Sequence, residues 1–115
     1  MLRNEQEMLI EERQNMRGGE GIVQLRHLFS ADELGKHARL SAEITLPPGA
    51  SIGPHRHEGE RELFYIMDGE ARLTENGKDH IMRPGDASLT GPCAEHSISN
   101  QGKSTVRLVA LIILD

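Results

Sequence analysis

Histidine and glutamate side chains of the types that bind transition metals occur at three places in the chain. His55 and His57 are two residues apart, so on a β-strand both imidazoles project from the same face, as two ligands of one metal ion must. Glu62 follows a turn-like stretch and heads an apolar segment, so a hairpin can bring it back beside the pair. His96 lies on a later expected strand and supplies a third imidazole. The sequence therefore predicts a metal site made by His55, His57, Glu62 and His96.

This set of donors restricts the metal and the ligand of the expected site. Imidazole nitrogens and a carboxylate suit Mn, Fe, Co, Ni, Cu or Zn better than Ca or Mg, and the sequence selects none of the six. One carboxylate against a divalent ion leaves about one net positive charge, which favours an anionic ligand. Two adjacent open positions on an octahedral ion would suit a chelating carboxylate, such as oxalate or a 2-oxo acid. The pocket around it is expected to be narrow and walled by Phe64, Ile66 and Ile98.

Short strands must hold these ligands, because the chain from residue 22 onward alternates strand patterns with turn signals. Residues 38–46 alternate apolar and polar side chains, which is typical of a half-buried strand. Asn76 and Gly77 indicate a two-residue hairpin, since both positions of a type I′ turn need positive φ. Many short strands predict an all-β sandwich or small barrel, and the need to avoid open edges favours the closed or jelly-roll form. The further strands are expected at 22–28, 63–67, 70–74, 78–82, 87–90, 96–99 and 105–114.

The first 21 residues form an N-terminal lead without such a pattern. Asn4 and Glu7 have the spacing of a capping box, which predicts the start of a helix, but the apolar residues that follow do not keep a helical period. Residues 16–21 are expected to form a loop. A second capping-box spacing, at Ser30 and Glu33, predicts one helical turn after the first strand.

Residues 49–69 read GASIGPHRHEGERELFYIMDG and resemble the first motif of the cupin family, G-x5-H-x-H-x4-E-x6-G. The second cupin motif, G-x5-P-x-G-x2-H-x3-N, is present through Gly85, His96 and Asn100. It departs from the family pattern because its proline, Pro92, is one place late, and Ala94 stands one past the usual second glycine. The resemblance covers about residues 37–114. It implies one domain, 1–115, folded as an all-β cupin double-stranded β-helix (a jelly-roll barrel) with an N-terminal extension, and a divalent transition metal held by His55, His57, Glu62 and His96.

The resemblance implies the fold and the metal more strongly than the reaction, because this barrel hosts oxidases, isomerases, decarboxylases and non-enzymatic binders. The first hypothesis is a metalloenzyme acting on a small carboxylate, similar to short cupins grouped with oxalate decarboxylases. One departure counts against full equivalence: Ile52 stands where two-domain oxalate-degrading cupins carry an arginine. The alternatives are a sugar-phosphate isomerase or dioxygenase, and a ligand-binding or sensory module without turnover. No catalytic residue is assigned.

Composition excludes several other classes of protein. The chain has 115 residues with 13 basic and 18 acidic side chains, a net charge of -5, so an extended nucleic-acid surface is not expected. The longest apolar run, 108–114, is far shorter than the roughly 20 residues of a membrane-spanning helix. Cys93 is the single cysteine, which excludes an intrachain disulfide and favours a reducing, cytoplasmic location.

Apolar side chains on both faces of two strands predict a homodimer. In the last strand, Val109, Leu111 and Ile113 alternate with residues that can fill the barrel, and two-sided apolar strands need cover on both faces. Three polar residues close to the expected ligands are assigned no role in the site. Glu60 and Glu95 are expected as solvated carboxylates, and Cys93 as a structural residue.

Overall fold

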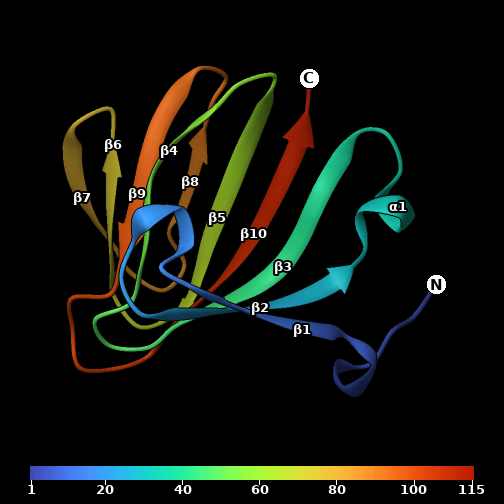
Figure 1. Cartoon of the computed structure of the whole chain (residues 1–115), viewed down its shortest axis with the longest axis horizontal. Helices are drawn as coiled ribbons and strands as arrows, with labels where there is room; N and C mark the ends of the chain where they lie inside the picture. Colours follow the sequence, from blue (N-terminus) through green and yellow to red (C-terminus); the bar gives the residue numbers. More distant parts are fainter.

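The computed structural model describes all residues 1–115 and consists of two antiparallel β-sheets with almost no helix (Figure 1). The larger sheet has the strand order β1 (Leu9–Gln14), β2 (Ile22–Phe29), β3 (Ala38–Leu46), β10 (Val106–Leu114), β5 (Glu60–Asp68) and β8 (Ala87–Thr90). The smaller sheet has the order β4 (Ser51–His57), β9 (Ala94–Ser99), β6 (Ala71–Glu75) and β7 (Lys78–Met82). The helical elements are α1 (Ala31–Leu34) and the 3-10 turns η1 (Glu5–Glu7) and η2 (Met16–Gly18). The all-β prediction is confirmed.

Alternation along the strands places one hydrophobic core between the two sheets. In β3, Ala42, Ile44 and Leu46 are buried, and in the neighbouring β10 every second residue from Val106 to Ile112 is buried. The smaller sheet contributes side chains such as Ile98 to the same cluster. Full burial of one such aliphatic side chain contributes about 1.5–3 kcal/mol, so the alternation stabilises the packing of the sheets.

The N-terminal lead is part of the sheet. The Asn4–Glu7 capping box is present, but it caps only the single turn η1, and residues 9–14 then form β1. This strand pairs with β2 from Leu9 opposite His27 to Gln14 opposite Ile22. The hydrogen bonds to β2 stabilise these residues as a strand, and their apolar residues have no helical period that would favour a helix instead. Figure 1 shows the lead, in dark blue, crossing in front of the barrel and placing η2 over β4. Residues 16–21, expected as a loop, begin with that turn.

Two local features follow from particular residues. The Asn76–Gly77 hairpin joins β6 to β7 with positive φ at both positions, as expected. Strand β4 carries His55 and His57. Gly53 and Pro54 interrupt the alternation of apolar and polar residues in this segment, so the sequence pattern does not reveal the strand. Proline is tolerated there because β4 is the edge strand of the smaller sheet.

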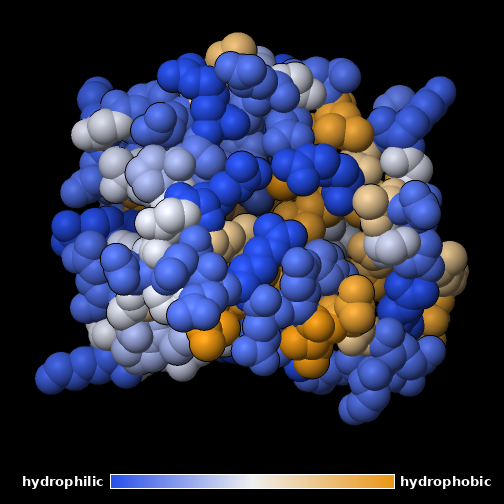
Figure 2. Space-filling view, viewed as in Figure 1, coloured by the Kyte–Doolittle hydropathy of each residue, from blue (hydrophilic) through white to orange (hydrophobic).

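Hydrophobic side chains are unevenly distributed over the face of the molecule shown in Figure 2. Figure 2 shows hydrophobic side chains gathered on the half of this face over β10, β3 and the N-terminal strands, and a mostly hydrophilic surface over β6 and β7. None of the helical elements is long and apolar enough to span a bilayer.

Candidate metal centre

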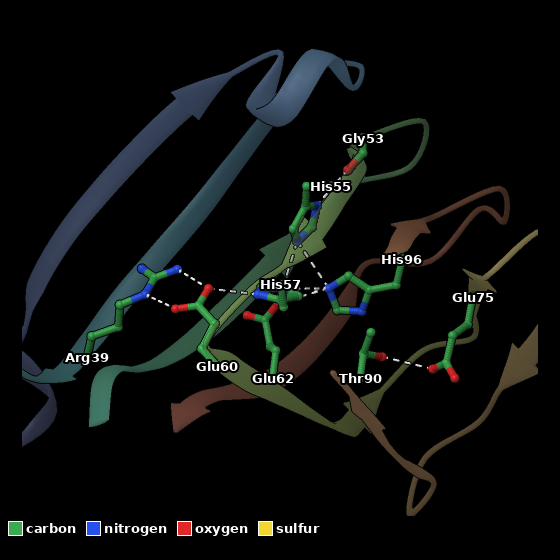
Figure 3. Close-up of polar contacts among 9 residues, drawn as sticks. All are labelled: Arg39, Gly53, His55, His57, Glu60, Glu62, Glu75, Thr90 and His96. Carbon is green, nitrogen blue, oxygen red and sulfur yellow. Dashed lines mark hydrogen bonds and ion pairs between the residues drawn. The ribbon is translucent and has the colours of Figure 1, made fainter. Parts of the chain in front are cut away.

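Three strands bring the four expected ligands to one point inside the barrel (Figure 3). His55 on β4 lies directly across the ladder from His96 on β9. His57 is two residues further along β4 on the same face, and a tight turn at Glu58 and Gly59 returns the chain so that Glu62 on β5 points at both strands. The arrangement thus follows from the two-residue period of β4 and from this turn.

The donor nitrogen and oxygen atoms of the four residues lie close to one another. Nε2 of His57 is 2.9 Å from Nε2 of His96, which is 3.1 Å from Nε2 of His55. Oε1 of Glu62 lies 2.9 Å from Nε2 of His57, 3.0 Å from that of His96 and 3.7 Å from that of His55. All four ligand atoms are within 4.8 Å of one another.

These separations fit a transition-metal ion. Ligand atoms at about 2.1 Å from one ion and at right angles to each other are about 3.0 Å apart. Of the six pairs among the four donor atoms, four are 2.9 to 3.1 Å apart, and a fifth, between Glu62 and His55 at 3.7 Å, corresponds to a wider angle. The residues present therefore could hold one metal ion with three imidazoles and one carboxylate.

Contacts around the rings fix their orientation. Nδ1 of His55 lies 2.8 Å from the carbonyl oxygen of Gly53, and Nδ1 of His57 lies 2.9 Å from Oε1 of Glu60, so both rings can donate from Nδ1 and present Nε2 to the centre. Nδ1 of His96 is buried without a hydrogen-bond partner, but the ring stacks on Phe64 with a centroid distance of 5.0 Å. His57 and His96 are each 1% exposed and Glu62 is 5% exposed, so the centre is shielded from bulk water.

Glu60 corrects the expectation of a solvated surface carboxylate. The tight turn directs its side chain inward, where it accepts from His57 and forms a two-point ion pair with Arg39 at 2.6 and 2.8 Å. The guanidinium of Arg39 lowers the pKa of Glu60 to about 2. Glu95 is exposed as expected, and Cys93 is an exposed turn residue with positive φ outside the group of donors.

The charge state of the centre suits metal binding. Burial raises the pKa of Glu62, but hydrogen bonds from the three histidines outweigh burial and hold this pKa well below its usual range. The neighbouring carboxylate of Glu62 raises the pKa of His57, against the opposing effect of burial. Glu62 is therefore ionised, and a proton on His57 competes with a metal ion at this site.

A cavity of about 50 Å³ opens onto three of the four donors. It has room for only a few water-sized groups. Phe64, Ile66 and Ile98, expected as its walls, instead pack in the core behind the ligands. The cavity is lined by His55, His57 and Glu62, by the apolar residues Met16, Leu25, Leu40, Ile44, Ile52 and Ile112, and by Arg13, Arg17 and Arg39.

Sequence reasoning did not identify the arginines of this cavity. Arg39 lies on an alternating strand whose pattern does not show that it reaches the donors, and Arg13 and Arg17 lie in a lead that carries no motif. Only the pairing of β1 with β2 and the seating of η2 on β4 bring this segment to the centre.

Comparison with known proteins agrees with this geometry. The family model described as "Cupin domain" matches residues 42–112. The chain is a cupin. This cupin is 46% identical over 100 residues to an oxalate-binding protein of Thermotoga maritima, covering 87% of this chain and 83% of the relative. It superposes on the crystal structure of a predicted oxalate decarboxylase from the same organism with a TM-score of 0.95 and 43% identity, over the whole of both chains. The cupin domain of Schizosaccharomyces pombe Cnp3, at 20% identity and a TM-score of 0.74 over 91% of this chain and 69% of that one, shares the fold alone.

Proposed function

We propose that this cupin binds a small carboxylate through a divalent transition metal held by His55, His57, Glu62 and His96. The observation that carries the proposal is the convergence of four donor atoms, at the spacing of adjacent metal ligands, beside a small cavity that three of them line together with three arginines. The similarity to a protein named as oxalate-binding supports oxalate as the first ligand to test.

The metal would supply a Lewis acid that fixes and polarises the oxygens of the carboxylate. The residues of the chain hold and tune the site. Glu60 and Arg39 keep Nδ1 of His57 engaged, so that Nε2 faces the centre. The apolar wall excludes water and thereby strengthens the attraction between the centre and an anion.

The size of the cavity separates the candidate ligands. A volume of about 50 Å³ suits a molecule of a few heavy atoms and disfavours a sugar phosphate. The shortage of aromatic side chains in its wall also disfavours a sugar. We therefore rank a two-carbon or three-carbon acid ahead of the isomerase alternative. The same assay distinguishes binding without turnover from decarboxylation or oxidation of the bound acid.

The experiment compares metal content and ligand binding in matched variants. Wild-type protein is stripped, reloaded with each first-row divalent metal, analysed for metal, and titrated by calorimetry with oxalate, pyruvate and acetate, while product formation is followed. We expect about one metal per chain and tighter binding of oxalate and pyruvate than of acetate. Glu62→Gln should weaken metal binding, whereas His80→Ala, a change at an exposed histidine of β7, should not. Equal affinity for the three acids, or binding that survives metal removal, would contradict the proposal.

We also propose that the cupin forms a homodimer through the outer face of the larger sheet. Tyr65 and Leu89 are 45% and 54% exposed there. The paired residues beside them, Val109, Leu111 and Leu63, are half-buried, so the face is a continuous apolar surface. A second copy of the same face would cover it.

Light scattering at micromolar concentration tests this assembly. We expect a dimer for the wild type and a monomer for Leu89→Lys. Ile81→Lys, on the other sheet, is the control and should leave the dimer intact. A wild-type monomer would contradict the proposal.

A cytoplasmic location is a further proposal, supported by the single, exposed Cys93, which suits a reducing compartment.

A further inference from the structure

The three arginines of the cavity differ in how their charges are compensated. Arg39 is held by both oxygens of Glu60, and Arg13 by Glu11 at 2.9 Å. Arg17 has no ion-pair or hydrogen-bond partner for its side chain in the protein, yet it lines the cavity beside the donor group. It is therefore the one arginine of the wall with all five N–H donors free for a ligand.

Close backbone contacts hold η2 against β4. A Cβ on Gly53 would lie 2.2 Å from the carbonyl oxygen of Arg17, and one on Gly19 would lie 2.3 Å from that of Ser51, so two glycines allow η2 to rest directly on β4. The amide of Ser51 also donates to Glu20 at 2.9 Å. These contacts connect η2 to the strand that carries His55 and His57.

Arg17 itself has an unfavourable backbone conformation. Its φ of 55° and ψ of 31° are left-handed, a region that non-glycine residues rarely occupy. Such residues cost of order 1–3 kcal/mol and tend to occur at ligand clamps. The packing of η2 on β4 holds Arg17 in this conformation, which glycine would adopt without strain.

We propose that Arg17 is the carboxylate-recognising residue of the cavity and confers selectivity for a small dicarboxylate over a monocarboxylate. The inference rests on the proposed function, since it assumes that a carboxylate occupies the cavity. A dicarboxylate such as oxalate has four acceptor oxygens, more than two open metal positions can engage, and a guanidinium can donate two parallel N–H hydrogen bonds to the oxygens that remain.

The charges around the cavity favour this role. The protein as a whole carries a net charge of -5, but the cavity wall has three arginines and one carboxylate, and a divalent ion would add to this local excess. Since Arg13 and Arg39 already have carboxylate partners, a bound dianion gains most from Arg17. Acetate has a single carboxylate, which the metal alone can satisfy.

The test is calorimetric titration of the Mn-loaded protein with oxalate and with acetate, together with a direct Mn titration. Arg17→Gln removes the charge. Arg83→Gln is the matched control, because it removes the same charge from an exposed ion pair with Glu70 away from the cavity. Arg17→Gly is the second variant: glycine adopts this φ without strain, so its melting temperature should equal or exceed that of the wild type.

We expect both Arg17 variants to bind oxalate about 10- to 100-fold more weakly, the loss associated with one charged hydrogen-bonded contact. Acetate and Mn affinities should stay close to those of the wild type, and Arg83→Gln should match the wild type throughout. Wild-type affinity for oxalate in Arg17→Gln would overturn this inference and leave the proposed function standing. An equal loss in Arg83→Gln, or loss of Mn binding in Arg17→Gln, would also overturn it. Failure of the wild type itself to bind oxalate would overturn the proposed function and this inference with it.

Discussion

Replacing Glu60 by glutamine tests whether the orientation of a buried imidazole controls metal affinity. Glu60 lies 2.9 Å from Nδ1 of His57 and is held by two contacts with Arg39. Glutamine keeps a similar shape but removes the charge that fixes the ring. Loss of such an outer partner typically weakens metal binding about 10- to 100-fold, which corresponds to about 1.4–2.8 kcal/mol.

The effect on folding should be much smaller. Arg39 has a side-chain exposure of 41%, so water can solvate the guanidinium once its partner is neutral. A partly exposed ion pair of this kind contributes about 1 kcal/mol or less to stability. The variant should therefore show a large change in metal affinity beside a small change in the free energy of unfolding of the metal-free protein.

The assay is a competitive metal titration with a chromophoric chelator, combined with urea unfolding of the metal-free protein. Glu58→Gln is the matched control, since Glu58 is an exposed carboxylate in the same turn and its loss changes the net charge equally. If both variants lost metal affinity by the same factor, the effect would be a general one of charge, and the positioning role of Glu60 would be refuted.

Two further predictions concern the remainder of the fold. The Arg3 guanidinium lowers the pKa of Glu33 to about 2 from an ordinary value of 4.5; Glu33 therefore stabilises the fold fully above pH 4.5 and loses this contribution as the pH falls toward 2. Urea unfolding of Glu33→Gln should show a shallower loss of stability over that range than the wild type, and identical profiles would contradict the prediction. Gly53→Ala should destabilise the protein by about 1–3 kcal/mol, because its Cβ meets the carbonyl oxygen of Arg17. Gly102→Ala, whose Cβ would meet only a side-chain oxygen at 3.6 Å, should be nearly neutral in the same thermal melts, and equal effects would refute the steric argument.

The four donors could be found from the sequence because their placement depends on short-range rules. His55 and His57 share a face through the two-residue period of a strand, and Glu62 follows one tight turn later. His96 is more distant, and the spacing of the second cupin motif identified it despite the late proline. Most strands of the barrel were predictable for the same reason, since alternation is a local property, but β1 and β4 do not show it.

The arginines of the cavity depend on long-range contacts that no local pattern encodes. Arg17 reaches the centre only because β1 pairs with β2 and because Gly53 lets η2 lie directly on β4. The inward position of Glu60 depends likewise on the exact turn between β4 and β5. A lead with no hydrophobic period therefore supplies part of the candidate site, and this could be recognised only in three dimensions.

An anomalous diffraction map from crystals of the Mn-, Fe-, Co-, Ni-, Cu- or Zn-loaded protein would locate the bound metal directly. We expect a single strong peak within about 2.0–2.3 Å of Nε2 of His55, His57 and His96 and of a carboxylate oxygen of Glu62. A metal peak elsewhere on the chain, or none with any of these ions at saturating concentration, would contradict this expectation.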